Sequence, residues 1–150
     1  WTVYDTPLDG GEGSGSFSVT FRDSLHGVVF GGDLGSAEDD AVGEETPPVR
    51  VAVSNDGGAS WDPAEEPGFE GAIFGGAWVT GPGEASDDAF GPPPLVAVAP
   101  AGAAYSLDGA RSWMPLDSAS YWGLGFASPE AGWLVGPGGR ITKVSFRRAP

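Results

Sequence analysis

Two eight-residue segments of the chain share one pattern, and this repeat constrains the fold more than any other feature of the sequence. Ser54–Trp61 and Ser106–Trp113 both read S-x-D-G-x-x-S-W, with their tryptophans 52 positions apart. Asp and Ser side chains hydrogen-bond to backbone groups in tight turns, and Gly adopts positive φ where the chain reverses. The pattern therefore predicts two hairpin turns of one kind in an internally repeated fold.

A second pair of segments aligns without gaps. Residues 17–31 match residues 122–136 in a leading aromatic residue, a Phe, a Gly, an apolar triplet and a final Gly, and residues 69–79 form a looser third copy. Alternation of apolar and polar residues, as in Phe17–Phe21, is typical of half-buried β-strands. Each repeat is therefore expected to consist of four short strands. The turn formed by the eight-residue segment, called the octad turn below, is expected between the third and the fourth strand.

These repeats predict an all-β fold: a section of a β-propeller with about three four-stranded antiparallel blades and Asp-box turns. The expected parts of this single domain, residues 1–150, are an outer strand at 1–6, a blade at 15–66, a blade at 68–118 and an incomplete blade at 120–147. Such a set leaves open sheet edges, which favour self-association. Either the chain is a fragment of a longer protein, which we favour, or copies assemble to close a ring. In a circular alternative, Trp1–Thr6 completes the last blade.

The charge balance restricts the partners. The chain has 21 acidic and 7 basic residues, a net charge of −14, and Lys143 as its single lysine. Such a surface repels phosphate backbones, so nucleic acid is not an expected partner. The absence of cysteine excludes disulfides. No apolar run approaches the roughly 18 residues of a membrane-spanning helix, so no membrane span is predicted. The inserts at 34–48 and 81–94 are acidic and lack the ligand spacing of a calcium loop, so no metal or cofactor is predicted.

Each octad residue has a structural reason to be present. The Asp accepts hydrogen bonds from its own turn, and the Trp packs its ring between neighbouring sheets. A structural Asp-box role is therefore predicted for Ser54, Asp56, Gly57, Gly58, Ser60, Trp61, Ser106, Asp108, Gly109, Ser112 and Trp113. We would seek a binding surface first at His26, Asp33, Trp78 and Trp122. Tryptophan is a frequent binding hot spot, and packing between sheets is the alternative role of these aromatic residues.

Asp-box turns recur in sialidases and related glycosidases, so glycoside hydrolysis is the enzyme alternative. A sialidase-like site needs an arginine cluster for the substrate carboxylate, a Tyr nucleophile and carboxylate partners. Phe21-Arg22-Asp23 begins like such a site but continues differently, and Arg111 is expected on the rim of an octad turn. The sequence indicates no assembled arginine cluster, and no catalytic residue is predicted.

Four segments of the chain carry a resemblance to a known family: residues 15–33, 51–61, 96–102 and 131–141. Together they resemble the bacterial propellers of the photosystem II stability/assembly factor-like family, within the wider BNR/Asp-box group. The likeness covers nearly the whole chain, and the chain resembles the C-terminal half of such a protein. It implies a propeller fold and an exported location. Plant and cyanobacterial members are assembly chaperones that bind a photosystem II subunit through arginine patches.

The predicted function is that of a non-enzymatic propeller, a protein-interaction or assembly scaffold with a protein partner of unknown identity. Two alternatives stay open. One is a glycoside hydrolase or sialidase-like enzyme on an Asp-box propeller, and the other is a purely structural repeat module of a larger secreted protein. A periplasmic or extracellular location is expected from the resemblance.

Overall fold

The computed structural model describes residues 1–35, 48–80 and 91–147. Within these ranges the chain forms eleven strands in three antiparallel sheets, and no α-helix. The predicted all-β fold with antiparallel sheets is therefore confirmed at this level. None of the described residues lies in a helix long and apolar enough to cross a membrane.

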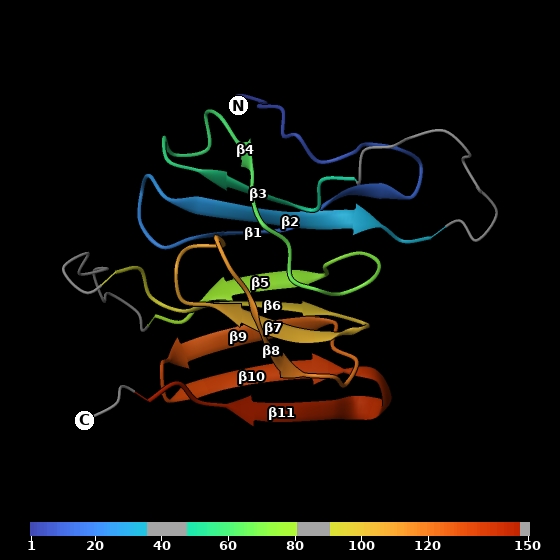
Figure 1. Cartoon of the computed structure of the whole chain (residues 1–150), viewed down its shortest axis with the longest axis vertical. Helices are drawn as coiled ribbons and strands as arrows, with labels where there is room; N and C mark the ends of the chain where they lie inside the picture. The colour runs from blue at the N-terminus through green and yellow to red at the C-terminus, as the bar shows by residue number, and fades with distance from the viewer. Residues whose placement is uncertain (36–47, 81–90, 148–150) are drawn as a thin grey trace.

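The strands of each sheet follow one another in chain order. The first sheet contains β1 (Ser14–Phe21), β2 (Gly27–Asp33), β3 (Val51–Ser54) and β4 (Asp62–Pro63). The second contains β5 (Gly75–Trp78), β6 (Leu95–Ala99), β7 (Gly102–Ser106) and β8 (Met114–Asp117). The third contains β9 (Gly123–Ser128), β10 (Ala131–Gly136) and β11 (Arg140–Val144). The sheets lie one on another, with the first at the top and the third at the bottom of Figure 1.

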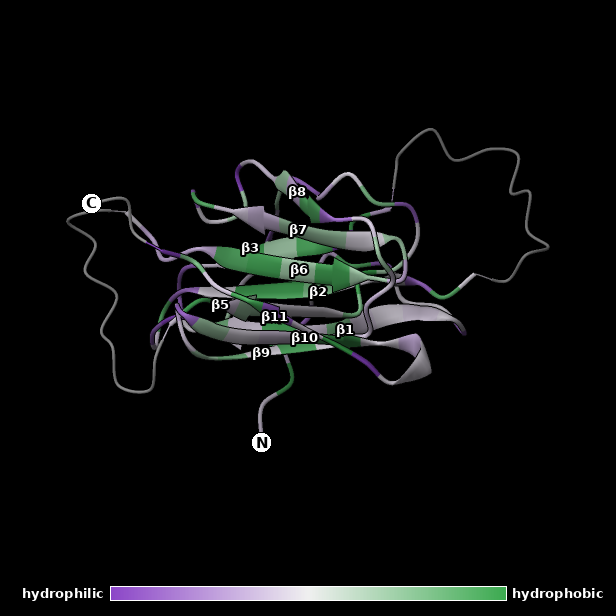
Figure 2. Ribbon diagram, turned by 90° about the horizontal axis from the view of Figure 1, so that it is seen from below, coloured by the Kyte–Doolittle hydropathy of each residue, from purple (hydrophilic) through white to green (hydrophobic). Residues whose placement is uncertain are grey.

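The second strands of the first two sheets are continuous apolar runs because both of their faces are covered. Every residue of β6 is buried, and in β2 only the terminal Asp33 is exposed. These strands are among the most hydrophobic parts of the chain in Figure 2. They place the core inside the stack.

Two apolar clusters join the sheets. The cluster of the first and second sheets includes Val28, Phe30, Val51, Trp78, Leu95 and Ala97. The cluster of the second and third sheets includes Val96, Val98, Tyr121 and Leu134. A smaller cluster places Leu8 against Val29 and Ala52, on the face of the first sheet that points away from the second.

The first strands of successive sheets also meet, because β1 contacts β5 and β5 contacts β9. Glycine permits the first of these approaches. A Cβ atom on Gly76 would lie 2.0 Å from the Phe30 ring, so any larger residue at this position would push the two sheets apart. The spacing of the stack at this point depends on the sequence of β5.

Residues 1–6 form no strand, contrary to the prediction of an outer blade strand there. Trp1 and Val3 are strongly exposed. An alternating segment becomes a strand only where a sheet edge offers it free backbone groups, and this segment lies at the first-sheet end of the stack (Figure 1). The third sheet lies at the other end, so Trp1–Thr6 does not complete it, and the circular alternative is wrong within this single chain.

Candidate functional site

The first octad turn joins β3 to β4 and is closed by its own side chains. The Ser54 hydroxyl donates a 2.8 Å hydrogen bond to Asp56 and accepts one of 2.8 Å from the Gly58 N–H. Asp56 also accepts from the Ser60 N–H at 2.9 Å and from its hydroxyl at 2.6 Å. Gly57 and Gly58 both have positive φ. Each of these residues therefore builds the turn.

The second octad turn, between β7 and β8, repeats this arrangement. Ser106 donates to Asp108 at 2.8 Å and accepts from the Ala110 N–H at 2.9 Å. Asp108 accepts from the Ser112 N–H at 2.8 Å and from its hydroxyl at 2.6 Å. Gly109 has positive φ, and so does Ala110, with φ of 68°, where the first turn has glycine.

These hydrogen bonds keep both turn carboxylates charged. Bonds from Ser60 and Ser54 lower the pKa of Asp56 to about 2. Burial raises the pKa of Asp108, but the bonds from Ser112 and Ser106 outweigh it, and the pKa is lowered. A carboxylate held in this way stabilises a turn and is a poor proton donor at neutral pH.

The tryptophans that end the two turns differ in their surroundings. Trp113 packs edge-to-face on Phe30, with ring centroids 6.2 Å apart, and donates its indole N–H to the Glu65 carbonyl at 2.8 Å. It therefore bridges the first and second sheets. Trp61 lies at the other face of the first sheet, packs on Phe21, and donates its N–H to Gly58 of its own turn at 3.1 Å.

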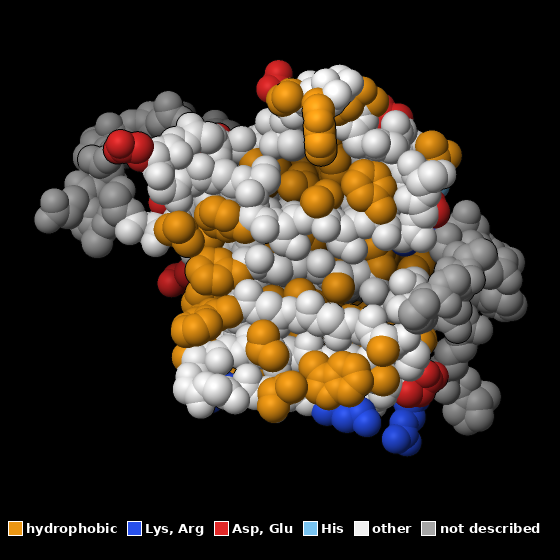
Figure 3. Space-filling model, turned by 180° about the vertical axis from the view of Figure 1, so that it is seen from behind, with side chains coloured by type: hydrophobic (Ala, Val, Ile, Leu, Met, Phe, Trp, Pro, Cys, Tyr) orange, Lys and Arg blue, Asp and Glu red, His pale blue; other side chains and the backbone are white. Residues whose placement is uncertain are grey.

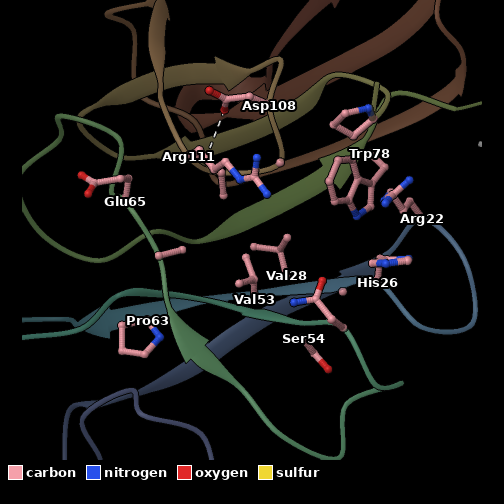
Figure 4. Close-up of a pocket in the computed structure, with 16 residues that line it drawn as sticks. Arg22, His26, Val28, Val53, Ser54, Pro63, Glu65, Trp78, Asp108 and Arg111 are labelled. Carbon is pink, nitrogen blue, oxygen red and sulfur yellow. Dashed lines mark hydrogen bonds between the residues drawn. The ribbon is translucent and has the colours of Figure 1, made fainter. Parts of the chain in front are cut away.

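A cavity of about 720 Å³ opens between the first and second sheets, which is within the range of about 300–1,000 Å³ for small-molecule sites. Its polar lining includes Arg22, His26, Glu65, Trp78, Asp108 and Arg111. Its apolar wall includes Val28, Val53, Pro63, Ala64 and Ala110. Figure 4 shows Val28 and Val53 at the first-sheet side of this space and the two arginines near Trp78.

The arginines reach the cavity from different sheets. Arg22 follows β1, its side chain is 11% exposed, and its guanidinium carbon lies 5.9 Å from the centre of the Trp78 ring. At this distance a cation is attracted to the face of an indole. Arg111 belongs to the second octad turn and extends toward Trp78 from the other side (Figure 4).

His26 is fixed by Asp23 in the turn between β1 and β2. Its Nδ1 lies 2.8 Å from Asp23 Oδ2, and Asp23 Oδ1 accepts the N–H groups of Leu25 and His26 at 2.8 Å each. Burial raises the pKa of Asp23, but these hydrogen bonds outweigh it and lower the pKa to about 2. The charged carboxylate holds the turn that carries Arg22 to the cavity.

Trp78 ends β5 and is 6% exposed. Its Nε1 is the one buried side-chain nitrogen or oxygen without a hydrogen-bond partner in the described part of the chain. The nitrogen lies on the side of the ring that faces His26 and Val28 (Figure 4). A buried indole N–H usually has an acceptor, so Trp78 brings an unsatisfied donor to the wall of the cavity.

The structure places the four predicted binding residues in different surroundings. His26 and Trp78 line the cavity between the first and second sheets. Asp33 lines another cavity of about 430 Å³, beside Glu70 and Phe74, and accepts the Gly35 N–H at 2.8 Å. Trp122 is 56% exposed and belongs to the lining of neither cavity.

All the acidic residues of the two predicted loops lie in 36–47 and 81–90, outside the described residues. Across 1–35, 48–80 and 91–147, no three His, Asp or Glu side chains gather in a group that could hold a metal ion.

The arginine pair is the feature that sequence reasoning missed. The sequence placed Arg111 on a rim and indicated no arginine cluster, whereas the structure brings Arg111 and Arg22 to one cavity. They belong to turns of different repeats, and only the stacking of the sheets makes them neighbours. The position of Arg111 within the octad was the one signal in the sequence that could have placed its side chain at this end of the sheets.

The third sheet ends the stack with an apolar face that the described residues leave open. The repeat of residues 17–31 in 122–136 puts Trp133 at the position of Val28 and Val135 at that of Phe30. Val28 and Phe30 are 1% and 0% exposed, whereas Trp133 and Val135 are 38% and 42% exposed. Seen from behind, apolar side chains reach the surface down to the lower end of the stack (Figure 3).

The first sheet has a complementary outer face. One residue on the first strand of each sheet has an equivalent partner on the second strand. These pairs are Val19 with Val29, Gly76 with Ala97, and Leu124 with Leu134. Val19, Gly76 and Leu124 are therefore equivalent positions. Val19 and its neighbour Phe21 are 57% and 40% exposed, while Leu8 covers Val29 on the same face.

Comparison with known proteins adds no relative: no family model, curated protein or solved structure matches the chain. The evidence for function therefore comes from the residues and contacts described above.

Proposed function

We propose that the chain is a section of an Asp-box β-propeller with a non-enzymatic function, a scaffold that joins protein surfaces. The contacts of β1 with β5 and of β5 with β9 support it, because the first strands of successive propeller blades lie side by side around the axis. Octad turns at the same place in the first two sheets support it too. The resemblance to photosystem II stability/assembly factor-like proteins implies the same role and an exported location.

The open face of the third sheet carries the proposal. Its residues Trp133 and Val135 stand where Val28 and Phe30 are covered by a neighbouring sheet. An exposed apolar area of a sheet commonly marks an interaction site. Its position at the end of the stack indicates that another sheet of the same repeat type is the natural occupant.

For the chain as given, the occupant we propose is a second copy of this chain, in the place that further blades would take in the longer protein favoured by the sequence. The first sheet presents Val19 and Phe21 at the positions that receive a neighbour on the second and third sheets. The third sheet of one copy would therefore meet the first sheet of the other. Two such head-to-tail contacts close a ring and leave no free end, which is the symmetric solution that oligomers prefer.

Four aspartates with shifted pKa values do not supply the acid that a glycosidase needs. A glycosidase of the usual type needs a carboxyl group that stays protonated near neutral pH to act as general acid. The shifted aspartates in the described ranges, Asp23, Asp56, Asp108 and Asp117, all have lowered pKa values. Turnover of fluorogenic glycosides or sialosides by the purified chain, above the rate in buffer, would contradict the non-enzymatic proposal.

Sedimentation equilibrium tests the scaffold directly. We expect the chain to associate into pairs and the Trp133→Ser variant to remain a single chain. Trp122→Ser is the matched control, because Trp122 is also exposed but lies just before β9. Alternate residues of a strand point to opposite faces, and Trp122 alternates in step with Leu124 and Phe126, which do not belong to the open face. A wild-type chain that stays single at all concentrations would favour the structural-module alternative instead.

A further inference from the structure

The cavity between the first and second sheets offers hydrogen-bond donors at its polar end. The Trp78 indole N–H is buried and has no acceptor within the described ranges, and Arg22 and Arg111 line the same cavity (Figure 4). Arginine and indole N–H groups donate and do not accept. A ligand that satisfies the Trp78 N–H and also meets the Arg111 guanidinium must bring acceptor atoms.

We propose that this cavity binds a monocarboxylate with an apolar body, whose oxygens accept hydrogen bonds from Trp78 Nε1 and the Arg111 guanidinium. The arginine fork matches the planar geometry of a carboxylate. Arg22 is not counted as a ligand donor: its side chain lies over the Trp78 ring, and its Nη1 is 3.9 Å from Asp23 Oδ2, so that carboxylate offsets part of its charge.

The remaining lining limits the charge of the ligand. Glu65 and Asp108 border the same cavity, and the chain carries a net charge of −14. A dianion such as a phosphate monoester would face more repulsion from these groups than a single carboxylate would. The wall formed by Val28, Val53 and Pro63 is apolar, so the body next to the carboxylate should be apolar too.

A free carboxylic acid and a peptide that ends in an apolar residue share this chemistry. Two probe pairs distinguish them: 3-phenylpropionate with its amide, and N-acetylphenylalanine with its amide. Within each pair only the carboxylate is removed. Preference for the first acid indicates a small metabolite, and preference for the second indicates a peptide C-terminus.

Titration of each probe into the 15N-labelled chain, followed by the indole N–H signals of its six tryptophans, tests the proposal. The Trp78 signal is identified by its loss in Trp78→Phe, which keeps an aromatic side chain and removes the N–H donor. We expect an acid to shift this signal downfield, with its amide at least about tenfold weaker, because a hydrogen bond to a charged group contributes about that much. Equal binding of acid and amide, or no shift of the Trp78 signal with either acid, would overturn the proposal.

Variants that need no change in the core provide the second readout. Arg111→Gln should weaken binding of the better acid by about tenfold in calorimetry, as the loss of one charged hydrogen bond predicts. Arg140→Gln removes the same charge from β11, away from the cavity lining, and should bind as the wild type does. Equal weakening in both variants would mean that net charge alone attracts the acid, and this too would overturn the proposal. Neither residue belongs to the open face of the third sheet, so failure here leaves the scaffold proposal standing.

Discussion

Trp133 occupies on the third sheet the position that Val28 occupies on the first, yet Trp133 is 38% exposed and Val28 is 1% exposed. The two positions are equivalent because each lies on the second strand of its sheet and directly follows a glycine. Gly27 faces the Phe21 ring on the first strand of its sheet, and Gly132 faces the Phe126 ring in the same way. The difference in exposure comes from the neighbouring sheet that covers Val28. The stack thus ends on an exposed apolar face of the kind that a further sheet covers elsewhere in the molecule.

The left-handed positions of the octad turns give the first prediction. Gly58 has φ of 88°, and a Cβ there would lie 3.3 Å from the Phe21 ring. Gly58→Ala should therefore lower the free energy of unfolding by about 1–2 kcal/mol, the cost of a left-handed residue with a side chain. Urea denaturation measures this change.

The equivalent position of the second turn is the control. Ala110 already holds φ of 68° and buries its methyl group. Ala110→Gly relieves the backbone strain but removes a buried methyl, so we expect a net change under about 1 kcal/mol. A Gly58→Ala variant as stable as the wild type would contradict the cost assigned here to a side chain in the left-handed conformation.

The turn carboxylates give a prediction in acid. The pKa values of Asp23 and Asp56 are lowered to about 2 from an ordinary value of 3.8. Because the folded chain binds these protons less readily than the unfolded chain, their contribution to stability is present above pH 4 and is lost as the pH falls toward 2. We expect the urea midpoint to fall through this window, and Asp56→Asn to be less stable at pH 7 and to fall less steeply in acid. Parallel curves for variant and wild type would contradict this role of Asp56.

Tyr121 gives a prediction for the contact between the second and third sheets. It is 1% exposed, and its hydroxyl donates to Asp117 and lies 3.2 Å from the Thr142 hydroxyl. Burial, and then the bond to Asp117, raise the pKa of Tyr121 above its usual value. Tyr121→Phe should destabilise the chain by about 1–2 kcal/mol, since a hydrogen bond to a charged acceptor is lost. It should also raise the pKa of Asp117, which NMR titration of that carboxyl measures, and an unchanged pKa would rule out the bond as its main cause.

The sequence could predict what repeats in it. Alternation in Phe17–Phe21 and the paired octads indicated antiparallel strands and their turns, because period two and turn chemistry are local properties. It could not predict that Trp1–Thr6 would remain unpaired. Whether this segment forms a strand depends on whether a sheet with a free edge lies next to it, and the order of the sheets in the stack decides that.

The candidate site was harder to predict for a related reason. His26 and Trp78 were expected as binding residues and line one cavity, but the presence of Arg22 and Arg111 in the same lining depends on how two sheets face each other. The unpaired Trp78 N–H depends on what packs around one atom. No motif or residue spacing in the sequence predicts either of these relationships.

A mixing experiment tests the head-to-tail contact most directly. Val19→Lys puts a charge on the outer face of the first sheet, and Trp133→Lys puts one on the open face of the third; both residues are exposed, so both variants should fold. We expect each variant alone to sediment as a single chain, because each has one disabled face. An equimolar mixture should form pairs, since the intact third sheet of one variant meets the intact first sheet of the other. A mixture that stays single, or a Val19→Lys variant that pairs by itself, would contradict a contact between the first sheet of one copy and the third sheet of the next.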